Sequence, residues 1–419
     1  MMPALPLRGA DKLAREGGDL DFVVPPGFAA TACKVVATVA RAEGWFVLQF
    51  RDVGYLAQIV LVNQLTGTAP TAFKIDFFDG VRWYGVGRDI VGDGLFASPY
   101  TLGHNETKLG GALNFLQKML VVGRLSDRDW ARVVATGVDA DYLTEFARMY
   151  QLPLTRSQIE ARAVSMPSKW RLRAASGGAR DPVSALAWFA RACMAHLKFK
   201  LRFGTTAGLI LGVSGLDGAG KSTIVDWLID AHRRAGSEQP CLVHLLPPWI
   251  PFPHQILRRR RTRTTYDHPY LEPPVRSNLN GGLRLAYYLC AFMLTRLSLW
   301  LGAIRGRLFI LDRSFLDFAS DLTRARIPDY PLPKWLLRAC CPKGLLLFID
   351  VPPEQVVVRK GELSSEKAIE LRERYLRTCN EIGRVHVIDG SASPKDVIKS
   401  VLQYIDAAIH VRMGSVGTG

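Results

Sequence analysis

The chain has 419 residues, 48% of them hydrophobic and 22% charged, and its formal net charge is +16. This length predicts two or three domains, and the composition is that of globular domains with real cores. Seven cysteines without a C-x-x-C pair argue against a disulfide framework or a zinc site and favour a reducing, cytoplasmic environment. The excess of positive charge favours anionic partners, such as phosphorylated metabolites, nucleic acid or an acidic membrane surface.

Residues 1–164 alternate short apolar strands with helical stretches and predict a first domain of the α+β class. Gly9 is followed after nine residues by the tripeptide D-L-D, and strand alternation puts Asp19 and Asp21 on one face, where two carboxylates can share a divalent metal. The pattern resembles the nucleotidyltransferase superfamily. That resemblance implies a third carboxylate on a neighbouring strand, for which Asp76 in FKIDFFDG is the candidate. A degenerate ligand-binding module and a solvated hairpin remain the alternatives.

Residues 165–204 predict a basic linker followed by a helix. The first part, Ser165 to Pro182, is rich in Gly, Ser and Arg, which is typical of linkers. The apolar residues that follow are spaced as in an amphipathic helix. At the far end of the chain, residues 412–419 predict a disordered tail.

Residues 205–411 alternate apolar strands with helices and predict a second domain of the α/β class. The expected strands are Gly208–Ser214, Cys241–Leu246, Arg307–Asp312, Gly344–Val351 and Arg384–Asp389. Nearly continuous apolar strands with helices between them indicate a parallel sheet that is buried on both faces, and therefore a three-layer domain.

Two segments of this domain bear on membranes and nucleic acid. Leu283 to Ile304 is long and apolar, but Arg296 would lie near the centre of a bilayer, where a charge is costly. We therefore expect a buried core helix and no membrane span. The run Arg258–Arg263 lacks the interleaved aromatic residues of a base-stacking surface, so a solvated loop is expected and nucleic acid is not the favoured partner.

The strongest motif is GLDGAGKS, which matches G-x-x-x-x-G-K-[ST] in full between an expected strand and an expected helix. Glycines allow consecutive backbone N–H groups to point at phosphate oxygens, and the helix N-terminus adds its positive dipole end. Lys221 is expected to reach the β- and γ-phosphates, and Ser222 to ligate magnesium. The predicted phosphate-binding residues are Gly215, Gly218, Ala219, Gly220, Lys221, Ser222 and Thr223.

A phosphate-binding loop of this kind needs a second carboxylate that holds the metal or its water shell. Asp312 directly follows the apolar strand LFILD, and Arg313 beside it would neutralise an acceptor phosphate or the transferred phosphoryl group. An aspartate that caps the next turn is the alternative. The chain has no N-K-x-D motif for guanine and no LSGGQ-type signature of transporter ATPases.

Three stretches in order, SGLDGAGKST, LFILDRSFLDFASD and LLLFIDVPPEQVVVRK, resemble the thymidylate kinase-like proteins of the nucleoside-monophosphate kinase group. The resemblance implies a flavodoxin-like P-loop fold, ATP and Mg²⁺ as the cofactors, and a mobile lid. It implies that Asp217 contacts a sugar hydroxyl of the acceptor, that Arg313 binds the acceptor phosphate, and that Val387 to Pro394 packs the adenine. The candidate lid cations are Arg359, Lys360, Arg372 and Arg374, with a solvated helix face as the alternative.

The acceptor region departs from that family. HLLPPWIPFP replaces the Arg-Glu-Pro-Gly after the second strand, and Ser314 replaces the aromatic residue after Asp-Arg. The predicted function is therefore an ATP-dependent phosphotransferase that acts on a nucleoside monophosphate or a related phosphorylated or sugar-like metabolite. The alternatives are an ATP-binding regulatory or assembly protein and a nucleic-acid-end kinase, and a homodimer is left open.

Overall fold

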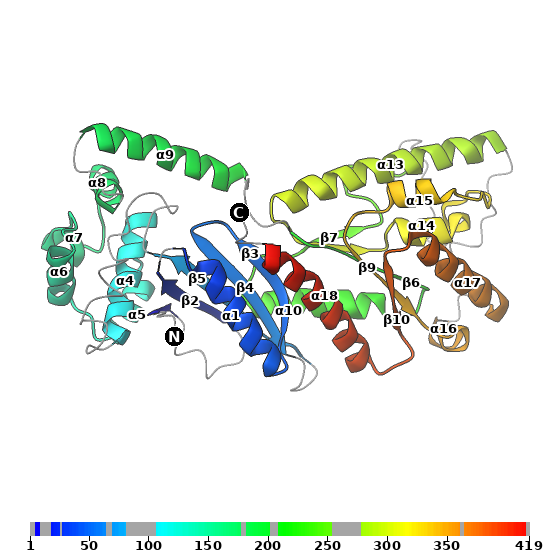
Figure 1. Ribbon diagram of the computed structural model, residues 1–419, viewed down its shortest axis with the longest axis horizontal. Coiled ribbons are helices and arrows are strands. Elements are labelled where there is room, and N and C mark those ends of the chain that lie inside the picture. Colours follow the sequence, from blue (N-terminus) through cyan, green and yellow to red (C-terminus); the bar gives the residue numbers. More distant parts are fainter. Residues whose placement is uncertain are drawn as a thin grey trace. The chain divides into compact units, whose positions relative to one another are not determined.

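The computed structural model describes residues 5–8, 18–25, 27–63, 69–80, 106–176, 182–201, 208–253, 278–360 and 364–415. The chain divides into two compact units, shown in Figure 1. The first comprises Met1–Thr206, Arg233–Ser237 and Ile409–Gly419, and the second comprises Ala207–His232 and Glu238–Ala408. Gly9, the arginine run at 258–263 and the expected boundary at 204–205 lie outside the described residues.

The first unit begins with a mixed five-stranded sheet in the order β1-β2-β5-β4-β3. Its elements are β1 (Leu5–Arg8), β2 (Gly18–Val24), α1 (Ala29–Ala42), β3 (Phe46–Asp52), β4 (Leu56–Asn63) and β5 (Thr71–Asp79). Strands β2 and β5 are parallel, and the other neighbours are antiparallel. The register between β2 and β5 pairs Asp21 with Asp76 and Asp19 with Lys74, so four charged residues meet on adjacent strands.

A helical layer follows the sheet in the first unit. Its helices are α4 (Glu106–Val121), α5 (Asp127–Ala135), α6 (Ala140–Met149), α7 (Arg156–Glu160), α8 (Met166–Ser176) and α9 (Pro182–Leu201). The side chains of Ser126, Asp139 and Thr155 accept hydrogen bonds from backbone N–H groups at the starts of α5, α6 and α7. The buried residues of α4 to α8 form one core around α4.

The expected linker at 165–182 is wrong in its first part, because residues 166–176 form α8. Leu172 is fully buried in the α4 core, and Arg173 donates from Nε to the carbonyl oxygen of Leu120 over 2.7 Å. The guanidinium also lies 5.0 Å from the ring of Trp170. Composition suggested a linker, but Arg173 caps the end of α4 and covers the ring of Trp170 with its guanidinium.

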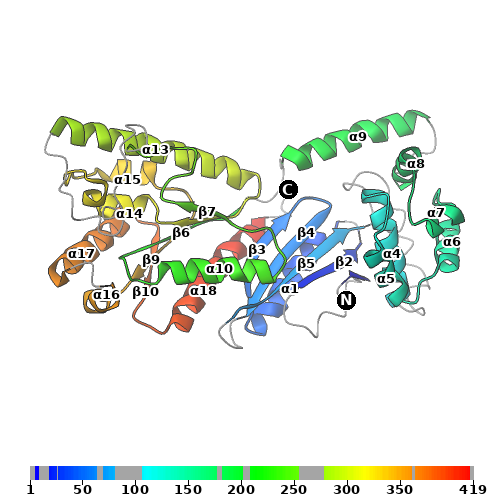
Figure 2. The same cartoon turned by 180° about the vertical axis from the view of Figure 1, so that it is seen from behind.

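The second unit is an α/β domain with a five-stranded, all-parallel sheet in the order β10-β9-β6-β8-β7. Its strands are β6 (Ile210–Gly215), β7 (Cys241–His244), β8 (Phe309–Asp312), β9 (Leu345–Asp350) and β10 (Val385–Asp389). Its helices are α10 (Lys221–Arg234), α13 (Asn278–Ile304), α14 (Phe315–Ser320), η3 (Leu322–Ala325), α15 (Lys334–Cys340), α16 (Pro353–Lys360), α17 (Ser365–Ile382) and α18 (Pro394–Ser415), of which α10 and α18 have their last residues in the first unit. Figure 2 shows α13 on one side of the sheet and α10 and α18 on the other, which gives the expected three layers.

Helix α13 is buried on one face only. Leu299 and Ala303 pack with residues of β6, β7 and β8, whereas the outward face carries exposed leucines. Within the described residues, Leu279–Ile304 is long and apolar enough to cross a membrane, with a window of mean hydropathy 1.4 that is 33% buried. The expectation of a buried core helix therefore holds for the inner face alone.

The expectation of a disordered tail at 412–419 is wrong for residues 412–415. Helix α18 continues to Ser415, and Met413 is buried. The apolar residues Ile409 and Met413 are four apart and extend the buried stripe of the helix by one more turn. Residues 416–419 lie outside the described part of the chain.

The packing of α8 yields a stability prediction. Leu172→Ala should lower the free energy of unfolding of the first unit by about 2–5 kcal/mol, because the substitution leaves a cavity in the α4 core. The measurement is denaturant-dependent hydrogen exchange of the α4 amides. Leu186→Ala on α9, where the side chain is 70% exposed, is the control and should cost less than about 0.5 kcal/mol. Equal effects of the two substitutions would contradict the placement of α8.

Candidate functional site

The loop between β6 and α10 lies at the carboxyl edge of the parallel sheet, after its central strand. Gly218 and Gly220 have φ angles of +93° and +86°, a region that side chains disfavour. A Cβ atom on Gly215 would lie 2.9 Å from the carbonyl oxygen of Ile349. Glycine is therefore required at these positions, and the loop leads directly into α10, whose first-turn N–H groups have no partner within the helix and can bind an anion.

Lys221 lies at the base of this loop. Its side chain is almost fully buried, and Nζ donates to the carbonyl oxygens of Gly215 over 2.6 Å and Leu216 over 2.8 Å. Burial lowers the pKa of Lys221, and the carboxylates of Asp317 and Asp217 oppose that shift. The next two residues, Ser222 and Thr223, are exposed on the first turn of α10. The predicted phosphate-binding residues thus share one loop and one helix end.

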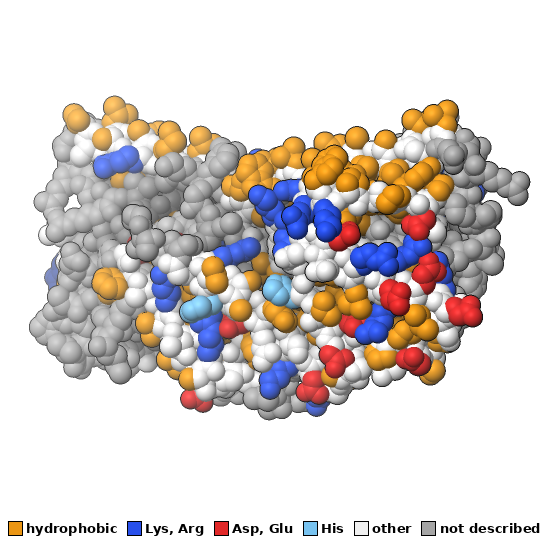
Figure 3. Space-filling model, turned by 45° about the vertical axis from the view of Figure 1, so that its right-hand side comes forward, with side chains coloured by type: hydrophobic (Ala, Val, Ile, Leu, Met, Phe, Trp, Pro, Cys, Tyr) orange, Lys and Arg blue, Asp and Glu red, His pale blue; other side chains and the backbone are white. Residues whose placement is uncertain are grey.

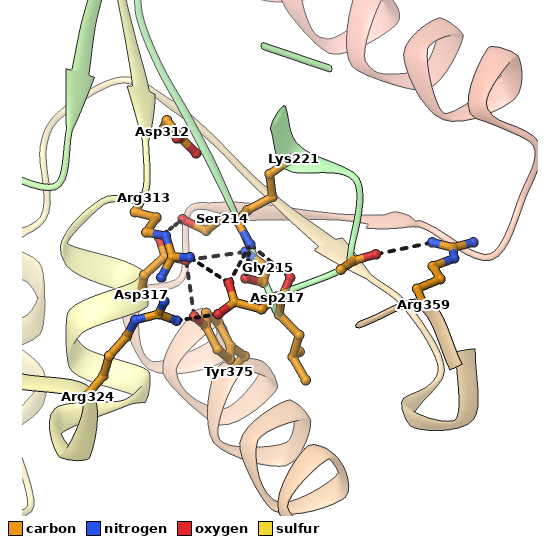
Figure 4. A network of polar contacts seen from close by, with 12 residues as sticks. Ser214, Gly215, Asp217, Lys221, Asp312, Arg313, Asp317, Arg324, Arg359 and Tyr375 are labelled. Atoms are coloured by element: carbon orange, nitrogen blue, oxygen red, sulfur yellow. Dashed lines mark hydrogen bonds and ion pairs between the residues drawn. The ribbon is translucent and has the colours of Figure 1, made fainter. Parts of the chain in front are cut away.

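Asp217 lies between two guanidinium groups (Figure 4). Its carboxylate oxygens each lie 2.6 Å from a nitrogen, one of Arg313 and the other of Arg324. Burial alone would raise the pKa of Asp217, but the positive charges of Arg324, Arg313 and Lys221 outweigh it and hold the pKa far below its usual range. Asp217 is therefore ionised, and the three cations converge on the space beside the loop.

Arg313 has a φ angle of +68°, which is unusual for a side chain of this size. The adjacent Ser314 caps α14, and Ser314 N–H donates to Asp317 over 2.7 Å, so the neighbouring contacts hold the backbone in this conformation. Strained residues of this kind concentrate at functional sites. The sequence predicted Arg313 as a site residue, but Arg324, on η3, was missed because no spacing rule connects it to the loop.

Asp312 ends β8 next to this cluster. His244 at the end of β7 lies 3.1 Å from Asp312, from Nδ1 to Oδ2. The hydrogen bond from His244 lowers the pKa of Asp312, although partial burial opposes the shift. An ionised carboxylate and the exposed hydroxyl of Ser222 are hard oxygen donors, which Mg²⁺ prefers, so these residues fit the expected ion.

Asp317 is a buried hydrogen-bond acceptor that links the residues around the phosphate-binding loop, and the sequence interpretation missed it. Its Oδ2 accepts from Ser214 Oγ over 2.6 Å, and its Oδ1 accepts from the Tyr375 hydroxyl over 3.1 Å. Gly215 N–H also donates to Oδ1 over 3.4 Å. The signal was available, since Ser314 and Asp317 form the S-x-x-D pattern of a capping box.

A pocket lies beside the phosphate-binding loop. It is lined on one side by Gly218, Ala219, Gly220 and Thr223, and on the other by Gly390, Ala392, Pro394, Val397 and Ile398. Arg359 also lines it and donates to the carbonyl oxygen of Gly218 over 3.4 Å. The structure thus brings the expected adenine-packing segment next to the loop.

The remaining lid candidates are engaged elsewhere. Arg372 forms a bidentate pair with Asp350, at 2.6 and 2.7 Å. Arg374 lies 2.6 Å from both Asp329 and Glu370. Their assignment to the lid is not supported by these contacts, because helix α17 uses both guanidinium groups to hold neighbouring segments. The side chain of Lys360 lies outside the described residues.

In the first unit, Asp19, Asp21 and Asp76 form an acidic cluster whose ligand atoms lie within 4.8 Å of one another. Lys74 lies within the cluster, with Nζ 3.1 Å from Asp19 and 3.1 Å from Asp76. Burial raises the pKa of Asp76. At Lys74 burial would lower the pKa, but the negative charges of Asp76 and Asp19 outweigh it and raise the pKa. An ammonium group already bridges two of the three carboxylates, so the residues as placed do not fit a divalent ion. The alternation K-x-D at Lys74 and Asp76 was a signal that the sequence interpretation left unused.

No protein-family model matches this sequence, and no curated protein matches it. Among solved structures, thymidylate kinase from Candida albicans is similar with 18% sequence identity and a TM-score of 0.33. The similarity covers 49% of this chain and 94% of that kinase. It is a distant likeness of fold over about half of the chain.

Removal of the Lys74 charge should create a metal site in the first unit. In Lys74→Met, Asp19, Asp21 and Asp76 lose their internal cation, and affinity for Mn²⁺ should rise by about tenfold or more. Electron paramagnetic resonance of bound Mn²⁺ measures this. Lys74→Arg keeps the charge and should bind no more Mn²⁺ than the wild type, and adding Asp76→Asn to Lys74→Met should remove the gain. Equal Mn²⁺ binding by wild type and Lys74→Met at this cluster would contradict the lysine's role.

Proposed function

We propose that the second unit is an ATP-dependent phosphotransferase of the thymidylate kinase-like type. One observation carries the proposal. Three cations, of Lys221, Arg313 and Arg324, lie near two ionised carboxylates at the carboxyl edge of the sheet. The carboxylates are those of Asp217 and Asp312, and the phosphate-binding loop leads into α10 at the same place. Phosphoryl transfer demands mainly positioning and stabilisation of charge, and this arrangement of groups supplies both.

In this proposal, the donor nucleotide occupies the loop and the pocket beside it. The N–H groups of the loop and of the first turn of α10 bind the phosphates, and Lys221 moves from the loop carbonyls to a phosphate oxygen, which carries more negative charge. The base packs among Pro394, Val397 and Ile398, and Arg359 covers the phosphates from the rim of the pocket. Mg²⁺, held through Ser222 and Asp312, would neutralise developing charge on the phosphates.

The acceptor in this proposal carries a phosphate, as a nucleoside monophosphate or a related small metabolite does. Arg313 and Arg324 both pair with the single carboxylate of Asp217, so these three side chains together carry a net charge of one positive unit. Guanidinium groups match the oxygen geometry of phosphate, and a phosphate monoester would complete the charge balance. Asp217 would then hold both arginines in position while they bind the acceptor.

The decisive experiment is an ATP-consumption screen over nucleoside monophosphates, phosphorylated sugars, free sugars and oligonucleotide ends. Lys221→Ala and Asp312→Asn should each lower kcat on the accepted substrate by about a hundredfold or more, because each removes a charge from the transition-state environment. Lys343→Ala changes an exposed lysine away from the site and should leave kcat unaffected. ATP binding without turnover on any acceptor would favour a regulatory or assembly protein instead.

Arg324 tests the acceptor assignment separately. Arg324→Ala should raise KM for the acceptor by about tenfold or more and leave KM for ATP unchanged, since a charge-assisted contact to phosphate is lost. Steady-state kinetics with each substrate varied in turn measures the split. Arg307→Ala, at an exposed arginine before β8, is the matched control. A rise in KM for ATP alone would place Arg324 on the donor side.

For the first unit we propose a nucleotidyltransferase-like ligand-binding module that acts without a metal. The supporting observation is Lys74, which occupies the position between Asp19 and Asp76. An ammonium ion neutralises carboxylates but offers no open coordination position for a substrate oxygen. Transfer of a labelled nucleotide that depends on Asp19 and Asp21 would contradict this proposal.

A further inference from the structure

The outward face of α13 is a continuous apolar surface. Its side chains between Leu279 and Leu301 are 44–73% exposed, whereas Phe292, Leu299 and Ala303 on the inner face are buried. Figure 3 shows hydrophobic side chains gathered along the upper edge of the second unit, where α13 lies. The exposed members of this outer face are Leu279, Leu283, Met293, Leu294, Leu297, Trp300 and Leu301. Apolar surface of this extent on a helix marks an interaction site.

Helix α15 contacts α13 and carries a further exposed aromatic side chain. Trp335 at its start is 69% exposed, and Trp300 on α13 is 52% exposed. Tryptophan prefers the boundary between hydrocarbon and water, because its ring is apolar and its N–H seeks a polar partner. Exposed tryptophans on these two contacting helices, together with the exposed leucines of α13, therefore favour a lipid boundary as the environment of this surface.

The charge of these elements has one sign. Neither α13 nor α15 contains an aspartate or glutamate. The exposed charged residues at their ends are Arg305, Arg307, Lys334 and Arg338. A second copy of the same surface would bring these cations against one another, which is unfavourable, whereas an anionic surface complements them. The whole chain carries a net charge of +16, which acts in the same direction.

We propose that α13 and α15 dock the second unit onto an anionic membrane surface, with α13 lying in the plane of the interface. The helix does not need to leave the domain, because Leu299 and Ala303 remain packed on the sheet while the outer leucines enter the lipid. Arg296 supports this orientation, since its guanidinium donates to the carbonyl oxygens of Arg338 and Ala339 on α15 and so faces the protein. Apolar insertion combined with cationic attraction is the chemistry of peripheral amphipathic helices.

Vesicle co-sedimentation of the full chain tests the proposal. The wild type should bind vesicles of equal parts phosphatidylcholine and phosphatidylglycerol at least about tenfold more tightly than pure phosphatidylcholine, and high salt should weaken that binding. Leu297→Glu with Trp300→Glu should reduce binding by about tenfold or more. Arg305→Gln with Lys334→Gln should reduce binding to the anionic vesicles alone. Circular dichroism confirms that each variant is folded.

Two control substitutions localise the effect. Val134→Glu on α5 and Leu186→Glu on α9 change exposed apolar residues of the first unit and should leave binding unaltered. Absence of binding to anionic vesicles at low salt overturns the proposal, as does loss of binding only in Leu186→Glu. A wild-type dimer in light scattering that Leu297→Glu dissociates would also overturn it, because a second copy would then cover the surface.

Discussion

The carboxylate of Asp317 is the constraint on which the candidate site depends. It accepts hydrogen bonds from the end of β6 through Ser214, from the start of α14 through the Ser314 N–H, and from α17 through Tyr375. These three elements are far apart in the sequence. Strand β6 leads into the phosphate-binding loop, Arg313 directly precedes the cap of α14, and α17 packs beside them. Because a buried carboxylate must have its acceptor positions satisfied, the three elements are held in one arrangement.

The electrostatic balance of the site follows from that arrangement. Asp217 holds Arg313 and Arg324 within hydrogen-bond distance, so the two guanidinium groups stay close despite their repulsion. The acidic cluster of the first unit shows the same principle with opposite sign, since Lys74 holds Asp19 and Asp76 together. In the second unit the cations outnumber the central carboxylate, which favours an anionic ligand. In the first unit the central charge is a cation, which disfavours a metal.

Much of the second unit could be predicted from its sequence because the signals are local. Each strand is a nearly continuous apolar run, and a strand–glycine loop–helix unit has a backbone geometry that its own residues impose, as Gly218 and Gly220 do through positive φ angles. Composition was a weaker guide, as α8 shows. Its arginines suggested a solvated linker, but Arg173 is buried and binds carbonyl oxygens at the end of α4.

The sequence by itself determined the phosphate-binding loop, the parallel sheet and the strand-end carboxylate Asp312, since each rests on residues that are neighbours in the chain. Only the tertiary structure decided the partners across long separations: Arg324 on Asp217, Tyr375 on Asp317, and His244 on Asp312. The tertiary structure also decided which face of α13 is buried. Hydropathy shows that a residue is apolar, but it does not show which other residues pack against it. Such contacts depend on the order in which strands join the sheet, and no local pattern records that order.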